Sequence, residues 1–223
     1  YLNVYPTRVQ RPCCTNSSPN GDMVYVRNFY SASLAGFPVK EDGSLEQMSF
    51  YIREKSLPDK HDGLHCVYAM QDGTICAIVL GQNKVICYDG DDHQKIGSYS
   101  IPDGYAPRQL VAGADSRFVY LLMQRPGRIF VLENHLKETG ILKKIQEISV
   151  IEDGYEGMYA TAAVIMTADG KYLLASTRGA DTMALFVIDR SEGTLKRTGV
   201  VKLSGRFPRD FNITEDGKYA VIA

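Results

Sequence analysis

A recurring tight-turn signal is the feature of this sequence that most restricts its fold. Short runs rich in Val, Ile, Tyr, Phe and Leu alternate with Gly, Asp, Asn and Pro, and no long segment keeps a helical period. The runs follow turns of one kind, whose second residues recur at intervals of 43 to 54 residues. These turns are Asn20-Gly21, Asp72-Gly73, Asp115-Ser116, Asp169-Gly170 and Asp216-Gly217. Such residues suit tight hairpins, so the chain is predicted to be all-β with a repeat of about 49 residues.

Each repeat contains four predicted strands. One strand precedes the turn, one follows it, and a third strand leads to a second turn and a fourth strand. Residues 34–45, 129–142 and 184–195 show this second half of the unit. A period of 40 to 50 residues with four strands is typical of a β-propeller blade. A β-sandwich of short strands is the alternative, but it predicts no fixed period. The favoured architecture is therefore a β-propeller of four-stranded blades.

The number of repeats bears on how much of a propeller is present. The 223 residues contain between four and five blades. Residues 219–223 stop inside a predicted second strand, and residues 1–5 begin with strand-like alternation and no preceding turn. Half a blade exposes unpaired edge strands, which promotes aggregation. We expect residues 1–223 to form a single propeller domain that is an interior portion of a longer chain, with a closed ring of four or five blades as the alternative.

Composition excludes several function classes. Lys and Arg number 25 against 26 for Asp and Glu, so no basic surface for nucleic acid or anionic membrane is predicted. No apolar run reaches the 18 or so residues that span a bilayer, and no signal-peptide pattern is present, which predicts a soluble, cytoplasmic protein. The five cysteines are odd in number and lack C-x-x-C spacing. Neither a disulfide framework, a metal nor a cofactor is predicted.

The phase of the repeat identifies a candidate site. Residues at equal phase in a propeller form a ring around the central channel. Eight positions before the second turn residue stand Cys13, His65, Arg108, Ala162 and Arg209. Guanidinium groups match carboxylate and phosphate oxygens, so three His or Arg side chains at one phase predict a channel mouth that binds a small anionic metabolite. The alternative is structural, with arginines that hydrogen-bond neighbouring carbonyl groups.

Arg178 extends this candidate site. It follows its turn by eight residues, at the end of a predicted second strand, and so lies near the same mouth but farther out. Its structural alternative is an ion pair between blades, with Asp181 or Asp210.

Several motifs also occur in the order found in a known family. They lie in residues 34–37 with 42–45, 106–108, 175–179 and 207–211. On these motifs the sequence resembles the seven-bladed propeller lactonases, which include bacterial 6-phosphogluconolactonases and fungal 3-carboxymuconate lactonizing enzymes. The resemblance covers nearly all of the chain and implies seven blades in the full protein. It implies hydrolysis of an acidic sugar lactone, or action on a muconolactone-type substrate, without metal or cofactor.

The resemblance also implies roles for individual residues. His65 would be the general base, because its ordinary pKa lies near neutral pH. Arg108 and Arg209 would bind the acid group and stabilise the oxyanion that forms as the lactone carbonyl is attacked. Arg178 and Gln109 would complete the substrate-binding set.

The chain departs from the family pattern at three positions. Active members are expected to carry Glu in place of Val164, His in place of Gln109 and a further His near Gly63. Loss of a carboxylate removes a candidate acid or base, worth ~10²–10⁴ in rate. The sequence therefore leaves two functions open: a lactone hydrolase or lactonizing cycloisomerase, and a propeller that binds an acidic metabolite or a protein without catalysis. It specifies neither the exact substrate nor the oligomeric state.

Overall fold

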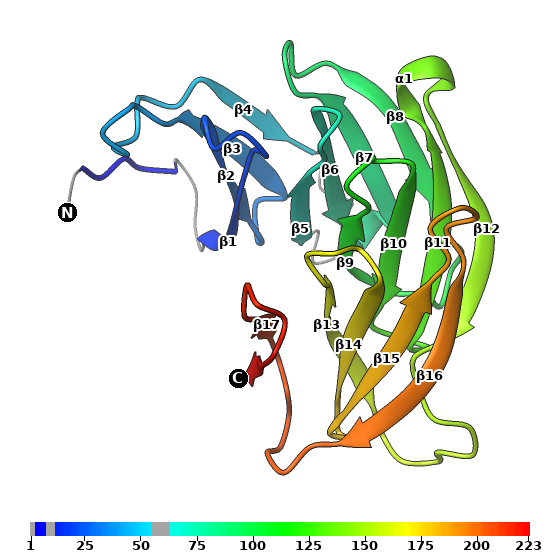
Figure 1. The fold of residues 1–223 in the computed structure, drawn as a ribbon. Helices are drawn as coiled ribbons and strands as arrows, with labels where there is room; N and C mark the ends of the chain where they lie inside the picture. Colours follow the sequence, from blue (N-terminus) through cyan, green and yellow to red (C-terminus); the bar gives the residue numbers. More distant parts are fainter. Residues whose placement is uncertain (1–2, 8–11, 55–62) are drawn as a thin grey trace. The chain divides into compact units, whose positions relative to one another are not determined.

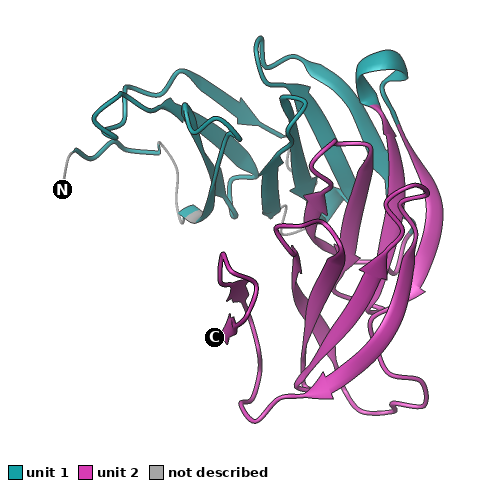
Figure 2. Ribbon diagram, viewed as in Figure 1, with its two compact units in different colours: residues 1–102, 136–141 teal, residues 103–135, 142–223 magenta. Residues whose placement is uncertain are grey.

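The structure is a computed structural model that describes residues 3–7, 12–54 and 63–223. The chain divides into two compact units (Figure 2), with residues 1–102 and 136–141 in unit 1 and residues 103–135 and 142–223 in unit 2. Both units consist of antiparallel sheets in which hydrogen-bonded neighbours follow chain order. The prediction of four-stranded sheets in an all-β chain is confirmed, because the described residues form four such sheets and one further pair of strands.

Unit 1 contains two four-stranded sheets (Figure 1). The first consists of β1 (Pro12–Ser17), β2 (Met23–Asn28), β3 (Ser33–Pro38) and β4 (Phe50–Arg53). The second consists of β5 (Leu64–Ala69), β6 (Thr74–Val79), β7 (Lys84–Asp89) and β8 (Lys95–Ser100), with the 3-10 turn η1 (Leu80–Gln82) between β6 and β7. A single α-helical turn, α1 (Leu136–Thr139), contacts β8 at Gly97, where a Cβ atom would lie 2.7 Å from the Leu136 side chain.

Unit 2 contains two four-stranded sheets and a strand pair. The first sheet consists of β9 (Pro107–Ala112), β10 (Phe118–Met123), β11 (Arg128–His135) and β12 (Ile141–Ser149), whose first residue belongs to unit 1. The second consists of β13 (Ala160–Met166), β14 (Tyr172–Arg178), β15 (Thr182–Ile188) and β16 (Leu195–Lys202). β17 (Phe211–Ile213) pairs with β18 (Ala220–Ile222).

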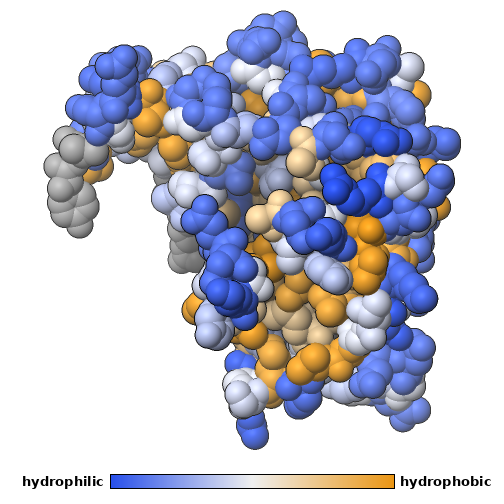
Figure 3. Space-filling model, viewed as in Figure 1, coloured by the Kyte–Doolittle hydropathy of each residue, from blue (hydrophilic) through white to orange (hydrophobic). Residues whose placement is uncertain are grey.

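The inner strands carry the core of each unit. Every residue of β6 and of β10 is buried, whereas the outer strands β8 and β16 alternate between exposed and less exposed residues. An inner strand lies between neighbouring sheets and reads as a continuous apolar run, and a strand with one wet face alternates. In unit 2 the Tyr120 hydroxyl donates to the Gly193 carbonyl at 3.1 Å, which joins β10 to the hairpin between β15 and β16. Hydrophobic residues also gather on the face of the β13–β16 sheet that is turned toward the viewer in Figure 3.

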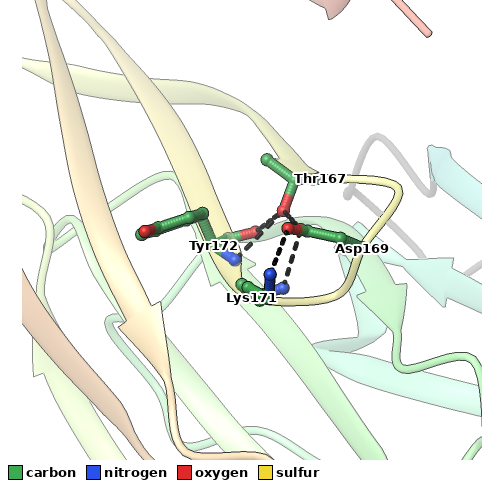
Figure 4. Close-up of polar contacts among 4 residues, drawn as sticks. All are labelled: Thr167, Asp169, Lys171 and Tyr172. Carbon is green, nitrogen blue, oxygen red and sulfur yellow. Dashed lines mark hydrogen bonds and ion pairs between the residues drawn. The ribbon is translucent and has the colours of Figure 1, made fainter. Parts of the chain in front are cut away.

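The predicted turns are present and share one geometry. The second residue of each turn has a positive φ, between 57° and 85°, which glycine adopts without strain. In the turn of Figure 4, the Thr167 hydroxyl donates to Asp169 Oδ1 at 2.6 Å, and the same oxygen accepts the Lys171 amide at 3.1 Å. The Tyr172 amide donates back to Thr167 Oγ1 at 3.1 Å. Residues 214–219 repeat this network, so the sequence repeat is also a repeat of hydrogen bonds.

The connection between β11 and β12 differs from a tight hairpin. The sequence places a second turn and a fourth strand at residues 139–142, but the helical turn α1 occupies residues 136–139 before β12 begins. The Gly140 amide donates to the Leu136 carbonyl at 2.9 Å, and Gly140 ends the helical turn with φ 74°. Leu136 is buried in unit 1, so its packing against β8 explains the longer connection.

Candidate functional site

The equal-phase residues occupy one recurring structural position. In β1, β5, β9 and β13 the pairing register shifts at or beside Cys13, His65, Arg108 and Ala162, which marks a β-bulge in each first strand. Before β17, the amides of Arg209 and Asp210 both donate to the Ala223 carbonyl, at 2.7 and 3.3 Å. A bulge redirects a side chain and is frequent beside active sites. Cys13, His65, Arg108 and Ala162 therefore share one position in their strands, while the shared channel mouth stays a prediction.

His65 belongs to unit 1. It is partly buried in β5, and its ring meets the Phe29 ring edge to face, with centroids 5.9 Å apart. Beside it, the Arg27 Nη1 donates to the Leu64 carbonyl at 3.0 Å, and Arg27 is 9% exposed. The sequence analysis missed Arg27, although an arginine inside a buried strand was a visible signal. The arginines of the predicted set lie in unit 2, and the structure defines each unit by itself, so their common site with His65 is not tested.

Gly63 explains one departure from the family pattern. A Cβ atom built at Gly63 would lie 2.1 Å from the Phe29 ring. Phe29 therefore fills the space that a side chain at this position needs, and a histidine there would require the Phe29 ring to move.

Arg108 is a buried tie between the two four-stranded sheets of unit 2. It is 7% exposed, and its Nε donates to the Ala162 carbonyl at 2.5 Å. Its Nη1 donates to Gln124 Oε1 at 2.8 Å. Arg108 therefore makes the kind of bond that the structural alternative describes, because these two donors bind protein oxygens. Arg108 fixes the start of β9 against the bulge of β13.

Gln109 and Val164 contact each other. Gln109 Oε1 accepts the Val164 amide at 3.0 Å, and Val164 is fully buried. These are two of the positions at which the sequence departs from the family pattern. A polar side chain on β9 thus satisfies a backbone donor of β13, and the pair acts as a second tie between the sheets.

Arg178 lies at the end of β14 and is held along one edge of its guanidinium group. Its Nε donates to the Ala160 carbonyl at 3.4 Å and its Nη2 to the Thr161 carbonyl at 3.2 Å. Arg178 is 7% exposed, and the Phe207 ring lies over it with 5.4 Å between Cζ and the ring centroid. Within the described parts of the chain it forms no ion pair, so the alternative of a bridge to Asp181 or Asp210 is not found.

Two exposed arginines add positive charge around Arg178. Burial lowers the pKa of Arg178, and the charges of Arg209 and Arg125 lower it further. Both neighbours are exposed and, among the residues that the structure covers, neither makes an ion pair. An anion bound among these like charges would be stabilised by all three of them. The cluster Arg125, Arg178 and Arg209 is called the arginine site below.

Arg125 was missed by the sequence analysis. It lies in the hairpin between β10 and β11, outside the strand phase that was counted. Its carbonyl accepts the Ala106 amide at 3.0 Å, and the neighbouring Gln124 carbonyl accepts the Thr161 amide at 3.2 Å. This hairpin is therefore bonded to the residue whose carbonyl holds Arg178. Because strand pairing is antiparallel, the end of β14 and the starts of β9 and β13 share one end of unit 2, where residues 203–210 also run in Figure 1.

The described residues contain no candidate metal-binding cluster. No group of three or more His, Cys, Asp or Glu side chains is arranged there to hold an ion. Residues 89–94, which begin like a calcium loop, form the hairpin between β7 and β8, with the Asp89 amide bonded to the Gln94 carbonyl at 2.9 Å. In the same parts of the chain, no helix has the length and apolar character needed to cross a bilayer.

Comparison with known proteins identifies the family. A 6-phosphogluconolactonase of Bacillus subtilis is 27% identical over 207 residues, which is 90% of this chain and 59% of that protein. The structure of a periplasmic gluconolactonase from Pseudomonas aeruginosa matches with a TM-score of 0.81 and 26% identity, covering 95% of this chain and 62% of that one. A crystal structure described as a putative 6-phosphogluconolactonase from Bacteroides fragilis matches with a TM-score of 0.76 and 29% identity, covering 95% and 62%.

The length of the match matters for what can be transferred. The chain spans about three fifths of the curated relatives that it matches. The family described as lactonase, 7-bladed β-propeller, matches residues 1–223, the whole of the sequence. The chain therefore belongs to the seven-bladed β-propeller lactonase family.

Proposed function

We propose that the full-length protein hydrolyses the lactone of an acidic sugar, with 6-phosphogluconolactone as the type of substrate. One observation carries this proposal: Arg178 is a buried cation that two backbone carbonyls orient and that no described carboxylate neutralises. A fixed, unopposed guanidinium suits a phosphate or carboxylate group. The name of the Bacillus subtilis relative supports the same substrate class.

The proposed chemistry adds one water molecule to the lactone. The water oxygen bonds to the carbonyl carbon, the ring C–O bond breaks, and the products are a free hydroxyl group and a carboxylate with release of one proton. In this proposal His65 accepts the proton from water, and Arg209 with Arg178 binds the anionic group and the developing oxyanion. The bonds of Arg108 to Ala162 and Gln124 favour a positioning role for Arg108, and Gln109 supports the same strand.

The test is turnover by the full-length protein, with spontaneous hydrolysis subtracted. Arg178→Ala is expected to lower kcat/KM by about 10- to 150-fold, the equivalent of ~1.5–3 kcal/mol for a hydrogen bond to a charged group. Arg190→Ala is the matched control, because Arg190 is an exposed arginine of unit 2 in the hairpin between β15 and β16, away from the end of β14. Equal rates for wild type and Arg178→Ala would reject the proposal. A muconolactone measured in parallel tests the second substrate type.

A second candidate is a propeller that binds an acidic metabolite, or a protein partner, without turnover. It is favoured by Val164 and Gln109, since the resemblance expects a carboxylate and an imidazole where these two residues bond to each other. This candidate predicts that 6-phosphogluconate or citrate raises the thermal midpoint of the full-length protein while no lactone is consumed above the spontaneous rate. Loss of that midpoint shift at high ionic strength would agree with an arginine site.

A further inference from the structure

Phe207 has an unusual backbone for a bulky residue. Its φ is 61°, in the left-handed region where aromatic residues are outliers. The Phe207 amide donates to Asp181 Oδ1 at 2.8 Å, and the same oxygen accepts the Gly179 amide at 3.2 Å. Asp181, in the hairpin between β14 and β15, thus clamps the loop before β17.

The clamp places the Phe207 ring on the Arg178 guanidinium. Phe207 is 58% exposed, so burial of apolar surface does not account for the strained backbone. Strain of this kind persists where the surrounding structure holds a side chain for a function. The side chain that Phe207 contacts is Arg178, with 5.4 Å between Cζ and the ring centroid.

The contacts of Arg178 limit how a ligand can reach it. The Nε and Nη2 edge is bonded to the carbonyls of Ala160 and Thr161, and Cζ lies over the Phe207 ring. Among described residues Nη1 has no hydrogen-bond partner, and it lies on the side of the guanidinium away from the Nε edge. An anion that binds Arg178 would therefore meet Nη1, and the Phe207 ring contacts the same guanidinium group.

We propose that Phe207 is a specificity-determining residue of the arginine site, which selects anions carried on a carbon skeleton over bare inorganic anions, and that Asp181 is its positioning residue. The inference rests on the proposed function, because it requires the arginine site to bind the substrate. The guanidinium groups bind the phosphate or carboxylate, and the exposed part of the Phe207 ring packs against the C–H groups of the sugar acid. Inorganic phosphate has no carbon skeleton and gains only the first of these contacts.

The experiment compares two probes on the full-length protein. Calorimetry measures the dissociation constants of 6-phosphogluconate and inorganic phosphate at one low ionic strength. Phe207→Ala is expected to raise the dissociation constant of 6-phosphogluconate by about five-fold and to change that of phosphate by less than about two-fold. Phe207→Tyr should keep the wild-type preference. Tyr172→Ala removes an exposed aromatic elsewhere in unit 2 and should leave both constants unchanged.

Two further variants separate ring contact from general stability. Phe207→Gly adopts φ 61° without strain, so it should fold with a thermal midpoint at or above that of Phe207→Ala and still lose the preference. Asp181→Ala keeps the ring but releases the Phe207 amide, and it should lose the preference to a similar degree. Adding Phe207→Ala to Asp181→Ala should then cause no further loss, which a separate structural role for Asp181 does not predict.

The outcomes distinguish this inference from the proposed function. If wild type binds both probes and Phe207→Ala or Phe207→Gly weakens both equally, or neither, the role of Phe207 is overturned and the arginine site stands. If wild type binds neither probe, the arginine site and the role of Phe207 fail together. A selective loss of 6-phosphogluconate binding in both Phe207 variants supports the inference.

Discussion

The two units join their successive sheets by different means. In unit 1 an apolar cluster that includes Tyr25, Leu34 and Leu64 connects β2 and β3 to β5. Two polar bonds accompany it, from the Arg27 guanidinium to the Leu64 carbonyl and from the Ala69 amide to Asn16 Oδ1. In unit 2 the corresponding joint uses polar bonds of Arg108 and Gln109 between β9 and β13, and the Thr161 hydroxyl of β13 donates to the Met123 carbonyl of β10 at 2.8 Å.

This difference between apolar packing and hydrogen bonding affects how rigidly a site is held. Apolar contacts fix the distance between two sheets but are not directional. Hydrogen bonds to named backbone atoms also fix the position of each strand along its neighbour. The strand starts that surround Arg178 are held in the second way, so the arginine site is built on a part of unit 2 with little freedom to slide.

Removal of the apolar joint should produce the largest effect. Leu64→Ala in unit 1 deletes a side chain that is 2% exposed and is expected to lower the free energy of unfolding of the full-length protein by about 2–5 kcal/mol. Denaturant titration measures the change. Val4→Ala is the control, because Val4 is 81% exposed and should change stability little. A loss below about 1 kcal/mol for Leu64→Ala would contradict the view that packing carries this joint.

Removal of the polar joint should have the next largest effect. Arg108→Met keeps much of the side-chain volume but leaves the Ala162 carbonyl and Gln124 without their donor, and it should lower the free energy of unfolding by about 1.5–3 kcal/mol. Arg27→Met in unit 1 removes one bond to the Leu64 carbonyl and should cost less. Equal losses for the two variants would remove the contrast between the joints.

Alkaline pH should test a third joint in unit 2. Burial raises the pKa of the Tyr120 hydroxyl well above its ordinary value, and nearby Asp115 and Asp189 raise it further. The hydroxyl therefore contributes stability that is complete below a pH of about 10, the ordinary pKa of tyrosine, and that falls as pH rises above it. Tyr120→Phe should lose about 0.5–1.5 kcal/mol near neutral pH with the bond to Gly193 and should show a flatter decline at high pH. A decline as steep as that of wild type in chemical unfolding would refute this assignment.

The smallest change in the free energy of unfolding is expected at acid pH, through the aspartates of the turns. Hydrogen bonds from the Thr167 hydroxyl and the Lys171 amide lower the pKa of Asp169, and Asp216 is held in the same way by Thr214 and Lys218. A lowered pKa gives stability that is complete above the unfolded value of about 3.9 and is lost as pH falls through the folded value. Asp169→Asn should flatten the acid side of the stability profile slightly. The same substitution at Asp216 should match it, and a clear difference between them would show that the turns are not equivalent.

Local features of the fold could be predicted from the sequence, and tertiary contacts could not. The five turns were visible because each depends on residues within a few positions of one another, as at Thr167, Asp169 and Tyr172. Counting by phase selected His65 and Arg108, and the structure places both at the bulge of a first strand, since each four-stranded sheet repeats the same strand order.

The arginine site and the bonds of Arg108 beside it were found only in part because the contacting residues are distant in sequence. Arg108 bonds to Ala162, 54 positions away, and Phe207 meets Arg178 across the loop before β17. Arg125 stands in a hairpin rather than at the counted phase, so periodicity gave no reason to select it. The helical turn α1 was missed for a related reason, because Leu136 is buried by packing against β8.

The chain-order pairing of the strands also bears on how the protein forms. Every four-stranded sheet is a meander, in which each strand pairs with the strand next to it in the sequence. Closing such short connections costs little chain entropy, and local contacts favour rapid formation. A four-stranded sheet can therefore assemble as soon as its own residues have left the ribosome, without waiting for distant parts of the chain. Synthesis then adds blades one at a time. In unit 2 the bonds from β9 to β13 wait for residues 162–164, and the contact of β14 with the Phe207 loop waits for residue 207.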